Sequence, residues 1–322
     1  KVIDEDAVQH VVYAPTSARG IATDAQGFSY VVGTTNGDMG STLSDGLNDL
    51  YLTKVDSEGR TVWMRSLGAA GSGDGVAVTV TDSGKIMVAG TVSGAFNGGD
   101  DGETDMMVAQ FDSQGVQDFA TSIRQIGNQN ATAMTVGDDG SIYVAGRSGN
   151  TATLVRLDAN GRVQEKRNLE GIGSSSITAL AMDNDGQVLA LTKNQDQASL
   201  MRFDAQSLSA DLGSVALGNV EARAIAISDS GEIAIVGAAT SATEGTQANA
   251  ISGGRDAFVM RVSADLSSQT TIYIGTGEND QGDSVAYMNG ALYVGGRTSG
   301  ALEGDKSGTL DGFVARIDLA NN

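Results

Sequence analysis

The sequence contains no cysteine, one proline and one histidine in its 322 residues. Without cysteine the chain has no disulfides, no thiolate metal ligands and no cysteine nucleophile. The one histidine, His10, rules out a histidine-rich metal site and makes any Ser-His-Asp triad depend on that single residue. We interpret His10 as a surface residue, so catalysis built on cysteine or on several histidines is excluded.

Long apolar runs and a recognisable leader are also lacking. No apolar stretch approaches the roughly 18–20 residues of a membrane span. The chain opens at Lys1 without a signal peptide, which we interpret as a mature or excised fragment. The absence of cysteine together with an acidic composition favours a secreted or cell-surface bacterial protein.

Basic and aromatic residues are scarce. Lys and Arg number 20 against 40 Asp and Glu, so the formal charge is 20 − 40 = −20. A surface this acidic repels nucleic-acid phosphates and anionic lipid head groups. Aromatic residues make up only 5% of the chain, so we expect a core of Val, Ile, Leu, Ala and Met and no nucleic-acid or membrane partner.

Glycine, in contrast, is abundant, with 44 residues that are placed periodically. One sequence pattern occurs six times. It begins with a small residue followed by an aliphatic one, continues with an Asp/Gly turn and an apolar run, and closes with a second apolar run that usually ends in Asp. The first apolar runs end at Gly33, Gly90, Gly146, Thr192, Gly237 and Gly296, with spacings of 57, 56, 46, 45 and 59 residues. A period of this size predicts an array of like supersecondary units.

Each repeat predicts four antiparallel strands. The first strand joins a residue no larger than Ser to an aliphatic, as in Gly20-Ile21, which indicates a crowded place where six strands converge. The next two strands are nearly continuous apolar runs, typical of strands covered on both faces. After the third strand an Asp such as Asp56 or Asp112 opens a turn. The fourth strand is more polar and fits an outer edge.

Four antiparallel strands repeated six times predict an all-β fold, a six-bladed β-propeller forming a single domain over residues 1–322. The sixth repeat stops after its third strand, and we expect an N-terminal strand at residues 7–14 to complete this last blade and close the ring. The predicted blades span about 17–70, 71–127, 128–172, 173–218, 219–276, and 277–318 plus 7–14.

Two stretches of the repeat carry a family likeness. Residues 20–34 read Gly-Ile-Ala-Thr-Asp-Ala-Gln-Gly-Phe-Ser-Tyr-Val-Val-Gly-Thr, and residues 256–262 read Asp-Ala-Phe-Val-Met-Arg-Val. Residues 312–318 match the second half again. This pattern resembles the SBBP-type β-propeller repeat of bacterial exported proteins, over essentially the whole chain. The resemblance implies a scaffold without a shared active site, although the third and fourth repeats are shorter and have Thr151 and Gln197 in place of the Asp before strand three.

Acidic residues before the third strand suggest two kinds of site. Asp49, Asp105, Asp256 and Asp311 occupy equivalent positions, and each is expected to cap its strand by accepting hydrogen bonds from backbone amides. The alternative is calcium, which takes six to eight oxygen ligands that flexible acidic loops can supply. Two loops qualify, although neither has the EF-hand spacing. Their candidate ligands are Asp100, Asp101, Glu103 and Asp105 in one, and Asp38, Asp45 and Asp49 in the other.

Three charged residues precede the small residue of the first strand, namely Arg19, Arg223 and Asp283. This position predicts that they lie near the central channel, where they bind a ligand or contact water. No catalytic residue and no cofactor other than calcium is predicted.

The sequence favours a non-enzymatic interaction module over an enzyme. We expect a domain of a larger bacterial extracellular or cell-surface protein, such as an adhesin or a flagellin-like appendage protein. It would bind a protein or glycan partner through its loop faces, because loops on a rigid frame usually carry recognition. The alternative is a glycan hydrolase or lyase that uses carboxylates and arginines at the pore mouth, an inference from fold analogy alone.

Overall fold

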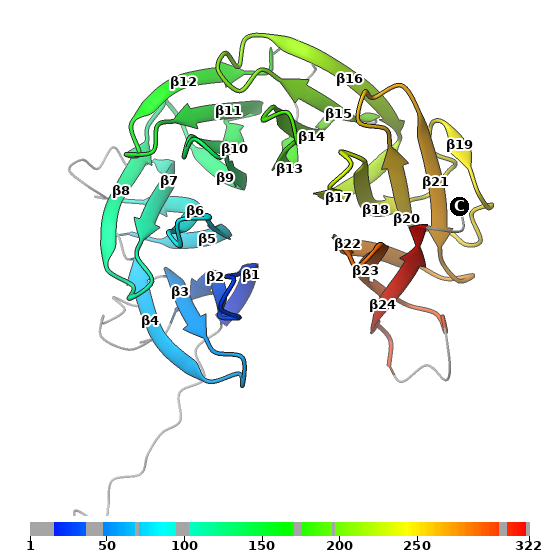
Figure 1. The fold of residues 1–322 in the computed structure, drawn as a ribbon, viewed down its shortest axis with the longest axis horizontal. Helices are drawn as coiled ribbons and strands as arrows, with labels where there is room; N and C mark the ends of the chain where they lie inside the picture. The colour runs from blue at the N-terminus through cyan, green and yellow to red at the C-terminus, as the bar shows by residue number, and fades with distance from the viewer. Residues whose placement is uncertain are drawn as a thin grey trace, which may run out of the picture.

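The computed structural model describes residues 16–36, 48–67, 71–94, 103–170, 176–194, 197–302 and 308–319. Six β-sheets are arranged around a central axis, and each sheet extends outwards from it like a blade (Figure 1). The chain is therefore an all-β, six-bladed propeller, as the repeats predict. The proposed closing strand at residues 7–14, with His10, lies outside the described residues.

The strands follow one another blade by blade along the chain. Blades 1 to 3 consist of β1 (Thr16–Thr23), β2 (Ser29–Thr35), β3 (Asp49–Val55), β4 (Thr61–Leu67), β5 (Gly73–Val80), β6 (Ile86–Ser93), β7 (Thr104–Phe111), β8 (Gln117–Ile123), β9 (Gln129–Val136), β10 (Ile142–Ser148), β11 (Thr151–Leu157) and β12 (Val163–Asn168). Blades 4 to 6 consist of β13 (Ser176–Met182), β14 (Val188–Asn194), β15 (Gln197–Phe203), β16 (Asp211–Gly218), β17 (Val220–Ile227), β18 (Ile233–Ala239), β19 (Thr246–Gln247), β20 (Asp256–Val262), β21 (Gln269–Ile274), β22 (Asp280–Met288), β23 (Ala291–Thr298) and β24 (Asp311–Asp318).

Blades 1 to 4 are four-stranded antiparallel meanders whose first strand lies innermost (Figure 1). Blade 5 has a fifth strand, because the two-residue β19 pairs in parallel with the outer strand β21. Blade 6 has three strands among the described residues, β22, β23 and β24. The inner strands contact one another in the order β1, β5, β9, β13, β17 and β22. No helix in the described part of the chain is long and apolar enough to cross a membrane.

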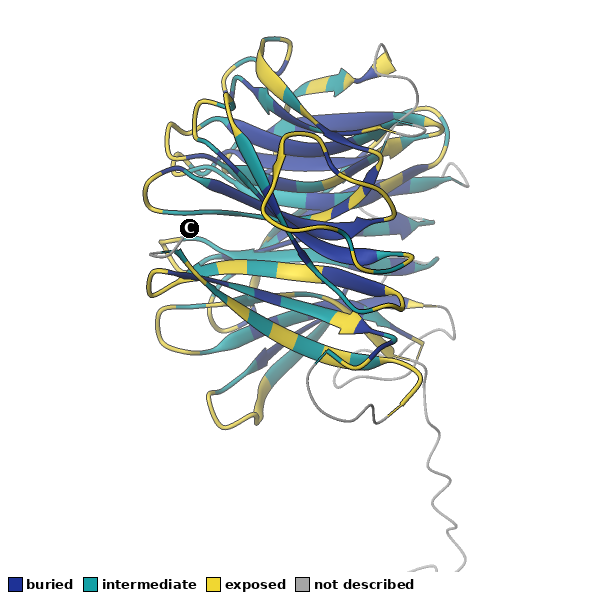
Figure 2. Cartoon of the chain, turned by 90° about the vertical axis from the view of Figure 1, so that its right-hand side faces the viewer, coloured by how far each residue is buried: buried dark blue, intermediate teal, exposed yellow. Residues whose placement is uncertain are grey.

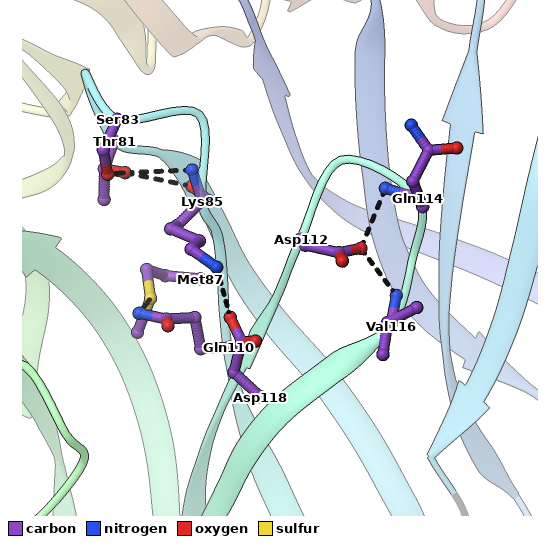
Figure 3. A network of polar contacts seen from close by, with 9 residues as sticks. All are labelled: Thr81, Ser83, Lys85, Met87, Gln110, Asp112, Gln114, Val116 and Asp118. Carbon is purple, nitrogen blue, oxygen red and sulfur yellow. Dashed lines mark hydrogen bonds and ion pairs between the residues drawn. The ribbon is translucent and has the colours of Figure 1, made fainter.

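The turn after the third strand is held by its aspartate, as the sequence predicts. In blade 2, Asp112 Oδ1 accepts hydrogen bonds from the backbone N–H groups of Gln114 and Val116, both at 2.9 Å (Figure 3). Between them Gly115 takes a φ of 75°, a conformation that other residues adopt only at a cost. Asp56 makes the same pair of bonds in blade 1.

Because of these turns, the free energy of unfolding depends on pH in the acidic range. Backbone N–H donors lower the pKa of Asp56 and of Asp112, and the hydroxyls of Ser263 and Ser267 lower that of Asp265 to about 2. A carboxyl whose folded pKa is depressed stabilises the protein above its unfolded pKa of about 4 and loses that contribution as pH falls towards the folded value. The free energy of unfolding should therefore fall between about pH 4 and pH 2 in urea titrations. The Asp265→Asn variant should show a shallower slope, and an equal slope would contradict the assignment.

The hydrophobic core is divided into clusters that lie between neighbouring blades. Leu52 of blade 1 packs with Val88 of blade 2, and Leu154 of blade 3 packs with Leu180 of blade 4. Figure 2 shows buried residues in the middle of the blades and exposed residues at the turns. Near the axis the inner strands are crowded, because a Cβ added to Gly20 would meet Val76 O at 3.2 Å. The small residue of the first strand therefore has the steric role that its repetition predicts.

Candidate functional site

All six inner strands carry a β-bulge at the same position. In β1, for example, Ala18 pairs with Gly33 and Gly20 pairs with Val32, so Arg19 is an extra residue without a partner on the neighbouring strand. A bulge bends its strand and re-aims the unpaired side chain. The equivalent bulged residues are Arg19, Val76, Thr132, Thr178, Arg223 and Asp283.

The bulges explain the glycine that ends the second strand in five repeats. A Cβ on Gly33 would overlap the carbonyl oxygen of Ser17, and one on Gly237 would overlap that of Glu221. Gly90, Gly146 and Gly296 face the corresponding carbonyls of Asp74, Asn130 and Gln281 in the same way. Blade 4 has Thr192 at this position, and its neighbours accommodate the side chain. The repeated glycine thus allows the inner strand to bulge towards the channel.

The six bulged side chains converge on one cavity of about 590 Å³ at the mouth of the channel. The three residues that the sequence predicts near the channel, Arg19, Arg223 and Asp283, are therefore brought together from blades 1, 5 and 6. The remaining lining residues are Asp74, Ala131, Ser176, Ile177, Lys193, Glu221 and Ala222. A second hollow of about 440 Å³ shares Arg19 and Asp74 with it. These volumes are in the range of small-molecule sites.

Two of the bulged residues join neighbouring blades. Thr132 Oγ1 donates to the carbonyl oxygen of Ile177 at 2.6 Å, and Thr178 Oγ1 donates to that of Ala222 at 2.9 Å. Each threonine thus ties its inner strand to the inner strand of the next blade. In blades 3 and 4 the bulged side chain therefore has a structural role, whereas in blades 1, 5 and 6 it is charged.

Five charged residues of the cavity form ion pairs that are exposed to solvent. Arg19 lies 3.8 Å from Asp74, and Arg223 lies 3.1 Å from Glu221. Asp283 lies 3.4 Å from the guanidinium of Arg297. All these side chains are 40–58% exposed, and exposed pairs contribute about 1 kcal/mol or less each. A ligand with a better geometric fit can therefore displace them.

Sequence reasoning missed several charged residues of this cavity. Asp74 and Glu221 lie two positions before the bulged residue, at a place where every repeat has a polar residue. Those residues are Ser17, Asp74, Asn130, Ser176, Glu221 and Gln281. Lys193 pairs with Ser176 across β13 and β14 and also lines the cavity. Asp74 and Glu221 could have been found from the polar residue that every repeat has at this position. Lys193 could be found only from the register between the first and second strands of its blade.

The calcium hypothesis concerns loops that lie largely outside the described residues, including Asp38, Asp45, Asp100 and Asp101. Of the other candidates, Asp49 begins β3 and is buried. Asp105 accepts a hydrogen bond from Ser122 and lies 3.5 Å from Arg124, while Glu103 accepts one from Gly127 N. Among the described residues, no group of three or more acidic or histidine side chains is arranged to hold a metal ion. Calcium at these loops stays a prediction.

The capping interpretation of the equivalent aspartates fits Asp256. This buried carboxylate accepts hydrogen bonds from the backbone N–H groups of Ser252 at 2.6 Å and Gly253 at 3.0 Å. Asp105 instead bonds the hydroxyl of Ser122 on the next strand of its own blade. The repeated position therefore serves local structure in both blades, with different partners.

The fold and its bulged inner ring define the chain as a β-propeller in which the channel mouth is the candidate binding site. Residues 13–38 match the family model described as SBBP, beta-propeller repeat. The match covers part of the first repeat, and the chain is similar to the SBBP repeat over that segment.

Three further similarities accompany this match. The chain is 28% identical over 339 residues to the Regulatory protein FlaEY of Caulobacter vibrioides, an alignment that covers 85% of this chain and 35% of that protein. The Neurospora crassa Pan2 WD40 domain superposes with a TM-score of 0.58 at 13% identity, over 88% of this chain and 75% of that one. A glucose dehydrogenase superposes with a TM-score of 0.52 at 12% identity, over 87% and 93%. At these identities the solved structures show the fold alone.

Proposed function

We propose that this propeller is a non-enzymatic interaction module whose recognition surface is the mouth of its channel. The observation that carries the proposal is the ring of six bulged residues, which share one position and line one cavity but belong to four residue types, Arg, Val, Thr and Asp. The backbone is held by the repeat, while the bulged side chain is arginine in blades 1 and 5 and aspartate in blade 6. A rigid frame that presents unlike side chains is the arrangement that recognition requires.

The charges at the mouth favour a partner with anionic groups. The cavity lining has three basic and three acidic residues, so it is far less acidic than the whole chain, which carries a charge of −20. The basic residues are Arg19, Lys193 and Arg223, and the acidic ones are Asp74, Glu221 and Asp283. Two further arginines outside the lining, Arg255 and Arg297, pair with Glu221 and Asp283. Basic groups gathered at one place attract acidic ligands, whereas the remaining acidic surface repels them.

The alternative of a glycan hydrolase or lyase receives no specific support from the cavity. Each of its three carboxylates forms an ion pair with an arginine: Asp74 with Arg19, Glu221 with Arg223 and Asp283 with Arg297. An inverting or retaining glycosidase needs one carboxyl group that gives a proton and another that acts on water or on the sugar. The arrangement is better suited to binding than to proton transfer.

The proposed setting is a bacterial extracellular or cell-surface protein, with this propeller as a monomeric domain and a protein or glycan as the partner. The similarity to a protein named as regulatory supports a non-catalytic role. The chain spans about a third of the length of that relative, which supports a domain within a larger host such as an adhesin or an appendage protein.

Binding to immobilised acidic and neutral oligosaccharides of equal length tests the proposal. We expect retention on acidic oligosaccharides that weakens as salt rises from about 50 to 500 mM, because exposed charge pairs are screened. No new reducing ends or unsaturated sugars should form during prolonged incubation. Turnover of either oligosaccharide would favour the enzyme, and salt-independent retention would contradict the role of the cationic residues.

A further inference from the structure

The turn after the third strand contacts the preceding blade through one backbone carbonyl. This carbonyl belongs to the residue that follows the Asp or Ser at the start of the turn. In blades 2, 4 and 5 it accepts a hydrogen bond from a side chain of the preceding blade. These bonds join Lys54 Nζ to Ser113 O at 3.3 Å, the hydroxyl of Tyr143 to Ala205 O at 2.8 Å, and Arg202 Nη2 to Ala264 O at 2.6 Å. We call this bond the interblade carbonyl contact.

The joint between blades 2 and 3 departs from this pattern. The equivalent carbonyl is that of Ala159, to which no side chain in the described part of the chain donates a hydrogen bond. The third-strand residue at this joint is Gln110, which donates to Met87 Sδ of its own blade at 3.3 Å instead (Figure 3). Its equivalents in the other five blades are all basic, namely Lys54, Arg156, Arg202, Arg261 and Arg316.

A cavity of about 350 Å³ lies where the contact is missing, at the lower end of the range for small-molecule sites. Its lining includes Gln110 and Met87 of blade 2 and Val136 and Ala159 of blade 3. The space is left because glutamine is shorter than arginine, and because Val136 stands where blade 6 has Tyr287. The cavity lies at the turns in which the first strands end, whereas the channel mouth lies where these strands begin. The two sites are therefore on opposite faces of the propeller.

The charges around this cavity favour a cation. Asp82 and Asp138 line it from the exposed turns after the first strands of blades 2 and 3. Neither carboxylate forms a hydrogen bond or an ion pair with another residue that the structure describes. The neighbouring ammonium of Lys85 is already paired, 2.8 Å from Asp118 (Figure 3). Two uncompensated carboxylates on a chain with a charge of −20 attract a positively charged group.

Blade 4 shows which cation suits this arrangement of acceptors. Arg202 Nε lies 2.8 Å from Asp183 Oδ2, in the turn after the first strand of its own blade, and Nη2 donates to Ala264 O of the next blade. In the cavity, Asp82 lies in the corresponding turn of blade 2, and Ala159 O is the corresponding carbonyl of blade 3. The joint between blades 2 and 3 thus has the acceptors for a guanidinium, but its own side chain is the uncharged Gln110.

We propose that this cavity binds a guanidinium group on an aliphatic stem, the chemistry of an arginine side chain. The N–H groups would donate to Ala159 O and to the carboxylates of Asp82 and Asp138, and the stem would lie against Met87 and Val136. A guanidinium has five N–H donors in a planar fork and is more weakly hydrated than an ammonium, so it suits a site with several acceptors in fixed places. The group belongs either to a free small molecule or to an arginine of another polypeptide.

Titration of the ¹⁵N-labelled protein with n-propylguanidinium, which reproduces the arginine side chain, tests the proposal. The backbone amide signals of Gly140 and Ala159 should shift and saturate in the millimolar range, as expected of so small a ligand. n-Propylammonium has the same stem and charge and should bind about threefold more weakly or worse. The peptide acetyl-Gly-Arg-Gly-amide distinguishes the two sources, since saturable binding of it indicates an arginine of a polypeptide and its exclusion indicates a free ligand.

Three variants locate the binding. Gln110→Arg supplies a guanidinium from the chain itself, as Arg202 does in blade 4, and should abolish the shifts. The Asp82→Asn/Asp138→Asn double variant should weaken binding about fivefold or more, because two exposed charge pairs are lost. Asp229→Asn is the matched control, since Asp229 is exposed in the corresponding turn of blade 5 and lies outside the cavity lining. Its binding should be unchanged.

Three results would overturn the proposal. The absence of saturable shifts would show that the cavity takes no guanidinium, and equal binding of n-propylammonium would show that charge alone is recognised. Equal affinities of the double variant and the Asp229→Asn control would place the binding elsewhere. The acidic oligosaccharides proposed for the channel mouth bind on the other face, so this proposal and the proposed function can fail independently.

Discussion

Replacement of Gly237 by alanine should lower the free energy of unfolding by about 3 kcal/mol or more, because the new Cβ overlaps a fixed backbone atom. That atom is the carbonyl oxygen of Glu221, in the bulged inner strand opposite. A flexible side chain could move away, but this carbonyl belongs to a strand packed between β18 and the neighbouring blades. The inner strand must shift, and the bulge that presents Arg223 shifts with it. Urea unfolding of the two proteins measures the effect.

Thr192→Ala provides the matched control for this substitution. Thr192 occupies the same place in blade 4, so its replacement keeps a Cβ where one already exists. The variant loses a buried hydroxyl that donates to Ser199 O at 3.3 Å, which should cost about 1 kcal/mol. If Gly237→Ala were no more destabilising than Thr192→Ala, the glycine would not be required by the bulge.

Truncation of Tyr143 should have an effect of similar size, through the core between blades 3 and 4. Its ring is 1% exposed and packs in the cluster that joins these blades, and its hydroxyl donates to Ala205 O of blade 4 at 2.8 Å. Tyr143→Ala leaves a cavity and an unpaired carbonyl, so unfolding should become easier by about 3–5 kcal/mol in denaturant titrations.

Tyr143→Phe separates the two contributions. This variant keeps the ring in the core and removes only the hydrogen bond to Ala205 O. The expected loss is about 1–2 kcal/mol, since the carbonyl stays buried without a donor. Equal losses for the two substitutions would mean that packing between blades 3 and 4 contributes little, and would contradict the stabilising role of the interblade cores.

The repeated parts of the fold could be predicted from the sequence because they depend on local chemistry. Small residues such as Gly20, the Asp/Gly turns and the apolar runs recur in every repeat, and the strands lie where that pattern predicts them. The two-residue β19 was not predicted, because Thr246 and Gln247 lie in a long polar loop and pair with β21 through tertiary contact alone.

The candidate site could be predicted in part. Arg19, Arg223 and Asp283 stood out because they are charged at a position next to the crowded axis. That this position is a bulge was not predicted, because one extra residue in a short strand of small residues gives no clear break in the hydrophobic alternation. Lys193 was missed for a related reason: it reaches the cavity from the second strand, opposite Ser176.

The central claim is that the channel mouth is the recognition surface, and a comparison of variants on the acidic oligosaccharides tests it most directly. The Arg19→Gln/Arg223→Gln double variant removes two cations of the cavity, while Arg60→Gln removes an exposed cation in the turn between β3 and β4. The account predicts that the double variant loses about tenfold or more in affinity, equivalent to about 1.4 kcal/mol, and that Arg60→Gln binds like the unmodified protein. Unchanged binding by the double variant, or an equal loss in both variants, would contradict it.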